Sequence, residues 1–253
     1  MSATLDPLIA RLLGLQIKLF ACQARLEDET DAEALHDLRT SVRRLRSLLR
    51  PLRGLPAVEE LEEAAKAVGQ LTTPLRDREV LAARLARQGF EQAAERRVDA
   101  MRGVFPEVAA SQPVAQLMQV LDAFPGFLRA AERQKLVRGL RQRVEKRLAK
   151  QWKQLRAALK DPAHDRHRLR LLIKRVRYAA EAYPELDKLP AATVKQLKAA
   201  QGALGDWHDH WQWLLQAEQE QDLQPCVAGW TVSLRKAELK ADKVLKKLLK
   251  AVD

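Results

Sequence analysis

Two stretches of the chain place a histidine and several arginine or lysine residues on one face of a helix. Within each stretch the cations follow one another at intervals of three and four residues, which keeps them on the same side. We name these sets the first basic stripe (His36, Arg39, Arg43, Arg46 and Arg50) and the second basic stripe (His167, Arg170, Lys174 and Arg177). Guanidinium groups stay charged and can hold two phosphate oxygens at once. Both stripes therefore predict binding of a ligand that carries many phosphates.

A solvent-exposed helix face is the alternative interpretation of such a run of charges. Faces of that kind usually mix signs, because like charges one turn apart repel each other. No acidic residue lies three or four positions from Arg39, Arg43 or Arg46. Apolar residues also recur one position before each cation, so the helix can pack into a bundle while its cations face a shared cleft. The alternative stays open, but it would have to account for the same pattern occurring twice.

The two stripes belong to an internal repeat. LHDLRTSVRRLRSLL, which starts at Leu35, aligns with RHRLRLLIKRVRYAA, which starts at Arg166, at a shift of 131 residues. Arg76-Asp77 and His208-Asp209 follow at a shift of 132, and a looser match pairs Arg11 and Lys18 with Arg143 and Lys150. We predict that the phosphate-binding residues are both basic stripes together with Arg44, Arg175, Arg11, Lys18, Arg143, Lys150, Arg76 and His208.

The remaining residues with chemical potential do not form a second kind of site in the sequence. His164 with His167, and His208 with His210, lack further ligands at metal spacing, so we predict no metal site and no cofactor. There is no glycine-rich phosphate loop and no Ser-His-Asp or Cys-His arrangement, and we therefore expect no enzymatic activity. The five tryptophans do not alternate with the basic stripes, which argues against a stacking platform for single-stranded nucleic acid.

Composition favours an anionic partner without identifying it. The 253 residues include 45 Lys and Arg against 33 Asp and Glu, a net charge of +12. Nucleic acid, an acidic membrane surface and polyphosphate all fit this excess. Cys22 and Cys226 are far apart, as in proteins of a reducing compartment. We find no leader sequence and no apolar run of about 20 residues, and we expect a cytoplasmic protein without membrane insertion.

Apolar residues recur at three and four throughout, which predicts an all-α protein. Proline and glycine positions divide it into helices at about 4–26, 31–53, 58–71, 75–101, 127–159, 161–183, 191–204, 206–221 and 225–251. We predict one domain over residues 1–253, made of two repeats at about 4–101 and 127–251 that are joined by a linker at 102–126 with a short helix inside. The repeats would be two four-helix bundles related by pseudo-twofold symmetry around a basic central cleft. Whether the lysines of the last helix join this cleft is left open.

The motif His-x-x-Arg-x-x-x-Arg-Arg-x-Arg, repeated and followed about forty residues later by Arg-Asp or His-Asp, resembles the CHAD family (conserved histidine α-helical domain). The resemblance covers about Leu5 to Leu249 and implies two four-helix bundles with a basic central cavity. It also implies binding of inorganic polyphosphate and association with polyphosphate granules. Lys174 departs from the pattern, since it keeps the charge of arginine but lacks its fork.

Taken together, these patterns predict non-enzymatic binding of inorganic polyphosphate, with a role in targeting to, or regulation at, polyphosphate granules. A helical protein that binds nucleic acid through the same basic cleft is the alternative. The two histidines that begin the stripes are expected to donate hydrogen bonds to phosphate, with a purely structural role as the other reading.

Overall fold

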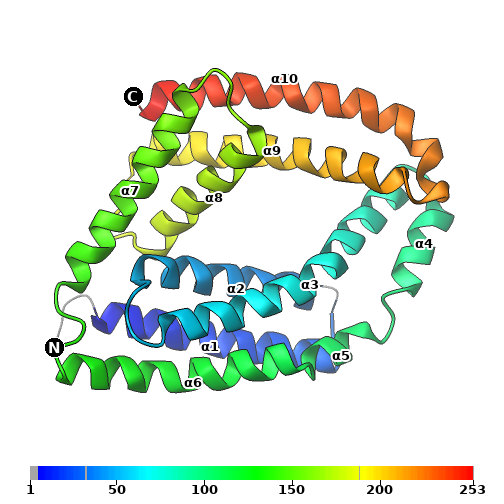
Figure 1. Ribbon diagram of the computed structural model, residues 1–253. Helices are drawn as coiled ribbons and strands as arrows, with labels where there is room; N and C mark the ends of the chain where they lie inside the picture. The colour runs from blue at the N-terminus through cyan, green and yellow to red at the C-terminus, as the bar shows by residue number, and fades with distance from the viewer. Residues whose placement is uncertain (1–4, 32, 188, 253) are drawn as a thin grey trace. The chain divides into compact units, whose positions relative to one another are not determined.

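The computed structural model describes residues 5–31, 33–187 and 189–252. Among these residues it contains ten α-helices and two short 3-10 helices, with no strand (Figure 1). The predicted all-α fold class is therefore confirmed. The chain divides into two compact units that meet between Val144 and Glu145, and each unit is described by itself below. None of the described helices combines the length and apolar character needed to cross a bilayer.

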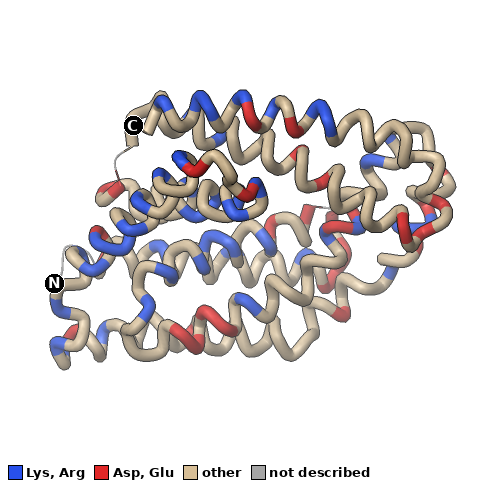
Figure 2. Tube along the Cα trace, turned by 45° about the horizontal axis from the view of Figure 1, so that its top comes forward, with Lys and Arg blue, Asp and Glu red and all other residues tan. Residues whose placement is uncertain are grey.

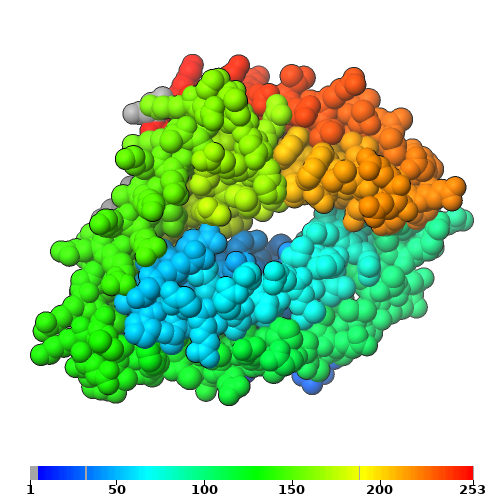
Figure 3. Space-filling view, in the orientation of Figure 1, coloured from blue at the N-terminus to red at the C-terminus, as the bar shows by residue number. Residues whose placement is uncertain are grey.

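The first unit consists of helices α1 to α6 and the start of α7. Their bounds are α1 (Leu5–Glu27), α2 (Ala34–Leu49), a 3-10 turn η1 (Arg50–Leu52), α3 (Val58–Arg87), α4 (Glu91–Asp99), α5 (Val104–Ala109) and α6 (Gln112–Arg133). Helix α1 packs against α2, α5 and α6, and α3 packs against α2, α4 and α6. Leucines of α1 and α2 at helical spacing are buried between these elements, which is the packing that the apolar stripe predicted. In Figure 3 the cyan residues of α3 lie directly against the lighter blue residues that connect α2 to α3.

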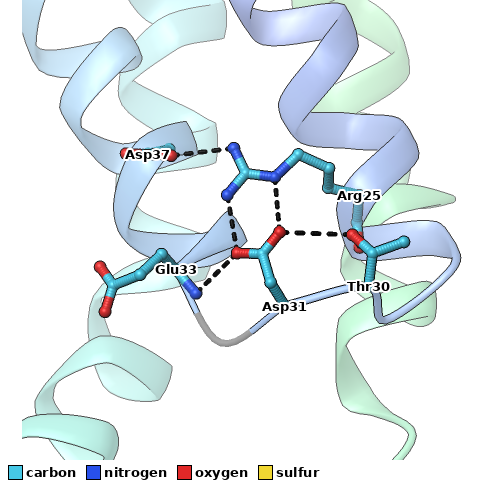
Figure 4. Close-up of polar contacts among 5 residues, drawn as sticks. All are labelled: Arg25, Thr30, Asp31, Glu33 and Asp37. Atoms are coloured by element: carbon cyan, nitrogen blue, oxygen red, sulfur yellow. Dashed lines mark hydrogen bonds and ion pairs between the residues drawn. The ribbon is translucent and has the colours of Figure 1, made fainter.

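A set of ion pairs stabilises the connection between α1 and α2. Arg25 near the end of α1 donates to both carboxylate oxygens of Asp31, at 2.7 and 2.8 Å, and to Asp37 of α2 at 2.8 Å (Figure 4). Hydrogen bonds from Arg25 lower the pKa of Asp31 to about 2, although partial burial acts the other way. This arrangement fixes the start of α2, and with it the register of the first basic stripe.

The second unit contains most of α7 (Leu140–Lys160), which begins just before the boundary between the units, and three further helices. These are α8 (Arg166–Ala182), α9 (Ala191–Ala217) and α10 (Val227–Val252), with a 3-10 helix η2 (Gln221–Cys226) before the last. Helix α9 packs along α10 and also against α8. Leu155 of α7, Ile173 of α8, Leu197 of α9 and Leu248 of α10 share one buried cluster. The lysines of α10 face outward and recur along the helix that leads to the C-terminus (Figure 2).

Several predicted helix ends are wrong because glycine and proline interrupt fewer helices than expected. Helix α3 continues through Pro74 and ends only before Gly89, whose φ of +83° suits glycine. Buried Thr72 and Leu75 flank the proline. Their packing holds the helix in spite of the backbone hydrogen bond that proline cannot donate. In the same way, α9 runs unbroken through Gly202 and Gly205, where two helices were predicted.

The interruption predicted at residues 102–126 is also misplaced. Those residues form α5 and most of α6, which passes through Pro125. The break lies instead between Arg133 and Leu140, where Lys135 and Gly139 have φ values of +64° and +68°. A single helix over 127–159 is therefore wrong. The organisation into two repeats at 4–101 and 127–251, their pseudo-twofold relation and a cleft between them stay predictions.

Candidate anion-binding site

Arg39 of the first basic stripe is held by the neighbouring helix α3. Its Nη1 atom donates hydrogen bonds to the hydroxyl oxygens of Thr72 at 2.9 Å and Thr73 at 3.1 Å, and to the carbonyl of Gly69 at 3.3 Å. Partial burial lowers the pKa of Arg39, and the nearby cations Arg76 and Arg43 lower it further, against an opposing effect of acidic groups on α3. Arg39, Arg43 and Arg76 are thus gathered where α2 packs on α3.

The other end of the first basic stripe lies over a glycine. The Arg46 guanidinium is 3.7 Å from where a Cβ atom of residue 69 would be, so it packs at van der Waals distance over Gly69. The Nε atom of Arg46 is buried and has no hydrogen-bond partner among the described residues. Near it, burial raises the pKa of Glu62, but an ion pair with Arg53 and the charges of Arg50 and Arg46 lower it on balance.

The second basic stripe surrounds a histidine of α9. Burial, together with the charges of Arg170, His167 and Lys174 on α8, lowers the pKa of His208 to about 4. The imidazole of His208 lies 5.5 Å from that of His167, between ring centroids. The structure therefore brings together four residues that the sequence placed in one candidate site, from two helices of the second unit.

Arg177 differs from its counterpart Arg46. It donates to Glu181, one turn further along α8, at 2.6 Å, and to the side-chain oxygen of Gln201 on α9 at 2.8 Å. In the first unit, the residue one turn beyond Arg46 is Arg50 rather than an acid. The second basic stripe is therefore shorter, because its last cation is neutralised by an acidic neighbour.

The two helix pairs α2–α3 and α8–α9 make their contacts in the same register. Arg46 lies on Gly69 and Arg177 bonds to Gln201. Likewise, Arg39 lies near Arg76, and Arg170 near His208. All four pairings agree with sequence shifts of 131 on the first helix and 132 on the second. Each pair thus places cations of one helix opposite a cation or histidine of the next.

A row of aromatic rings extends the second site along α9. His208 contacts His167 and Trp211, with ring centroids 5.5 and 5.8 Å apart, and Trp211 stacks nearly parallel on Trp207 at 6.2 Å. Trp211 is 39% exposed, whereas Trp213 is 8% exposed and packs on Trp230. The tryptophans do not alternate with the basic stripes along the sequence, yet Trp207 and Trp211 lie next to His208 in space. One turn of α9 separates Trp207 from Trp211, and this places both on the same side of that helix as His208.

Local hydrogen bonds account for other residues at this end of the second unit. The carboxylate of Asp165 accepts the backbone N–H groups of His167 at 2.9 Å and Arg168 at 3.3 Å, and so caps the start of α8. Arg166 holds both oxygens of Asp242 on α10. The Nδ1 atom of His210 lies 2.7 Å from the carbonyl oxygen of Asp206, within its own helix. Helix α8 is therefore fixed in register at its first turn.

Some predicted site residues do not join either cluster in the structure as described. Arg44 is exposed, and Arg175 lines a small cavity of about 280 Å³ with Arg168 and Gln154 on the α7 side of α8. Arg143 reaches the turn between α2 and α3, 3.7 Å from the Cβ position of residue 54, and Lys150 belongs to the other unit. Arg11 and Lys18 belong to α1. These six assignments stay untested predictions.

Acidic residues of α3 also lie close to the first stripe, and spacing along a single helix could not predict them. Helix α3 supplies Glu62, Asp77 and Glu79, and Glu79 pairs with Arg76 at 2.9 Å. A cavity of about 980 Å³ begins at this pair and is otherwise lined mainly by acidic and alanine residues of α3, α4 and the α1–α2 connection. Its charge makes it unsuitable for a polyanion, and the group of cations on α2 and α3 ends at Arg76.

Residues 12–218 match the model of the CHAD domain family. The chain belongs to the CHAD family. A solved structure described as the CHAD domain from the plant Ricinus communis is similar over 99% of this chain and 92% of that one, with 23% sequence identity and a TM-score of 0.70. A search of curated proteins found no match. Membership establishes a CHAD-type helical fold, and the expectation of that fold from the histidine motif is confirmed.

Within the described residues no group of three or more His, Cys, Asp and Glu side chains could hold a metal ion. The buried Cys22 and Cys226 lie in different units and are not bonded to each other. Besides the acidic side chains of α3 and Glu181, the two sites offer cations, imidazoles and hydroxyls. Such groups can hold an anion through charge and hydrogen bonds.

Proposed function

We propose that this CHAD domain binds inorganic polyphosphate through the two basic stripes, without turning it over. The observation that carries the proposal is the grouping of like charges in each unit: Arg39 with Arg43 and Arg76, and His208 with Arg170 and Lys174. Burial lowers the pKa values of Arg39 and His208, and the repulsion between the grouped cations lowers them further. A ligand with closely spaced phosphates would relieve this repulsion at several positions at once.

Binding without catalysis fits the ion pairs that the neighbouring carboxylates form. Glu79 is engaged by Arg76 and Glu181 by Arg177, so these acids are held in ion pairs beside the stripes. A phosphotransfer enzyme uses carboxylates to hold Mg²⁺ or to orient a nucleophile. Prolonged incubation with long-chain polyphosphate should leave its length unchanged on a gel, and progressive shortening would contradict the proposal.

We expect binding of this kind to bring the protein to polyphosphate granules in the cytoplasm. A fluorescent fusion should concentrate at granules in polyphosphate-accumulating cells and stay diffuse in cells that make none. The same fusion carrying charge reversals in both stripes should be diffuse in either background.

The nucleic-acid alternative gains support from the exposed ring of Trp211 beside the second stripe, because bases stack on aromatic side chains. A competition titration separates the two functions. Fluorescently labelled polyphosphate is displaced with unlabelled polyphosphate, duplex DNA or single-stranded RNA, at equal phosphate concentration and at two salt concentrations. We expect polyphosphate to compete best, with affinity that falls as salt rises. Stronger competition by either nucleic acid would favour the alternative.

The site assignment has its own test with a matched control. Arg43→Glu combined with Lys174→Glu reverses one charge in each stripe and should abolish binding. Arg87→Glu combined with Arg235→Glu changes the net charge equally at exposed positions outside both stripes. The control pair should weaken binding only through the loss of overall charge. Equal effects of the two pairs would show that the stripes are not the site.

A further inference from the structure

The second unit places an exposed tryptophan at the end of its cation cluster. Rings follow one another from His167 through His208 to Trp211 and Trp207, at centroid distances between 5.5 and 6.2 Å. Trp207 supports Trp211 from one side, since their planes differ by only 8°. With 39% of its surface exposed, Trp211 leaves part of its ring open to solvent. A supported, partly open indole ring of this kind can stack a further flat ring.

The register of α8 against α9 places this ring beside cations. Arg177 meets Gln201, and His208 lies among Arg170, His167 and Lys174. The helices therefore run antiparallel, and Trp211, three residues beyond His208, lies toward the start of α8. Moving along α8 from that end, a ligand passes His167, then Arg170, then Lys174. These positions are about one helical turn apart, or roughly 5 Å for each step.

The first unit lacks the tryptophan at the corresponding place. At the shift of 132 residues, Trp211 corresponds to Glu79, which pairs with Arg76 at 2.9 Å. Trp207 corresponds to Leu75, a buried side chain. One helix pair thus ends in an ion pair and the other ends in stacked rings. An unbranched inorganic chain has no use for a flat apolar surface, so the difference points to a ligand with a ring at one end.

We propose that the second unit binds a nucleoside polyphosphate, with its base stacked on Trp211 and its phosphates along His167, Arg170 and Lys174. This rests on the proposed function, because it assigns the same cations to phosphate and adds a subsite for a base. The buried Nδ1 atom of His208 has no hydrogen-bond partner among the described side chains, and it lies between the two parts of the subsite. The first unit, with Glu79 in place of the tryptophan, binds phosphates alone.

The test compares two tetraphosphates, of which one carries a nucleoside at its end. Adenosine 5′-tetraphosphate and inorganic tetraphosphate are titrated into the whole protein by calorimetry, with long-chain polyphosphate as a third ligand. Stacking of one base on an aromatic side chain is worth about 1–3 kcal/mol. We therefore expect the nucleotide to bind at least five-fold more tightly than inorganic tetraphosphate. The middle of that range corresponds to about thirty-fold.

Substitution of the tryptophan should remove this difference and nothing else. Trp211→Ala should bind both tetraphosphates equally, with the affinity that the wild type has for inorganic tetraphosphate. Trp211→Phe should keep most of the preference for the nucleotide. Val194→Ala serves as the control, because Val194 is a similarly exposed apolar residue near the start of the same helix. It should leave all affinities unchanged. The circular dichroism of each variant checks that the helices are intact.

The outcomes separate this inference from the function on which it rests. Suppose that long-chain polyphosphate binds but the nucleotide binds no more tightly than inorganic tetraphosphate. The base subsite is then refuted and the proposed function stands. The same holds if the nucleotide binds more tightly and the difference persists in Trp211→Ala. If no phosphate chain binds the wild type, the proposed function fails first. An adenine oligoribonucleotide is included as a fourth ligand. Its binding through Trp211 more tightly than the nucleotide would assign the site to single-stranded nucleic acid instead.

Discussion

His208 should make the stability of the protein depend on pH in a defined window. Burial and three nearby cations hold its pKa at about 4, against an ordinary value of 6.5. Between these two values the unfolded chain takes up a proton on this residue while the folded protein does not. Protonation therefore favours unfolding, and the free energy of unfolding falls as the pH falls from about 6.5 to about 4.

The size of this effect follows from the pKa difference. One pKa unit corresponds to about 1.4 kcal/mol, so the full difference would amount to roughly 3 kcal/mol. The side chain of His208 is only partly buried, and water screens part of the interaction. We therefore expect His208 to contribute about 1–2 kcal/mol to the loss of stability between pH 6.5 and pH 4.

Urea denaturation followed by circular dichroism at several pH values measures this contribution. Other groups also titrate below pH 6.5, and the comparison that isolates His208 is with His208→Gln, which cannot take up the proton. The variant should lose about 1–2 kcal/mol less than the wild type between pH 6.5 and pH 4.5. His164→Gln is the control, because His164 lies in the turn before α8 and outside the cation cluster.

If the free energy of unfolding depended on pH in the same way in the wild type and in His208→Gln, the reasoning would be refuted. In that case His208 would titrate alike in the folded and unfolded chain, and the clustering of cations around it would carry no energetic cost. If His164→Gln reduced the pH dependence of the free energy of unfolding as much as His208→Gln does, the effect would not be specific to the cation cluster.

Three further predictions concern the same helices. Bound polyphosphate should raise the pKa of His208, so the affinity of the protein for polyphosphate should increase as the pH falls from 7 to 5. Calorimetry should show a smaller increase in His208→Gln. Glu181→Gln should release Arg177 for phosphate and strengthen polyphosphate binding by about two- to five-fold, the scale of one exposed ion pair, in the same titration. Thr72→Val removes one acceptor from Arg39 and should lower the free energy of unfolding by about 1–3 kcal/mol in urea denaturation. No change in stability would show that Thr73 and Gly69 suffice to hold the arginine.

Much of the fold could be predicted because local periodicity determines it. The apolar residues that precede each member of the first stripe face the core, as their spacing predicts. Helix ends were harder, since whether a proline breaks a helix depends on what packs around it. Pro74 is tolerated because the turns beside it are buried through Thr72 and Leu75. That burial comes from residues of other helices and cannot be read from the neighbouring sequence.

The candidate site was predictable along each helix but not between helices. Spacing alone placed Arg39 and Arg43 on one face. It could not show that Arg39 is held by hydroxyls of α3, or that Glu62 reaches the far end of the stripe, because these partners lie on another helix. The aromatic row depends on both kinds of contact. Spacing along α9 places Trp211 beside His208, but only the packing of α8 against α9 places His208 among the cations.

Each cation face is made by two helices that follow one another in the chain, and this has a consequence for the order of folding. The bonds from Arg39 span about 30 residues, and the bond from Arg177 to Gln201 spans 24. Contacts of such short range form early, because little chain entropy is lost in closing the loop between them. The α2–α3 face could therefore assemble on the ribosome before the second unit has been synthesised. Under the proposed function, a phosphate chain would bind this face of the nascent protein and stabilise the first unit during synthesis.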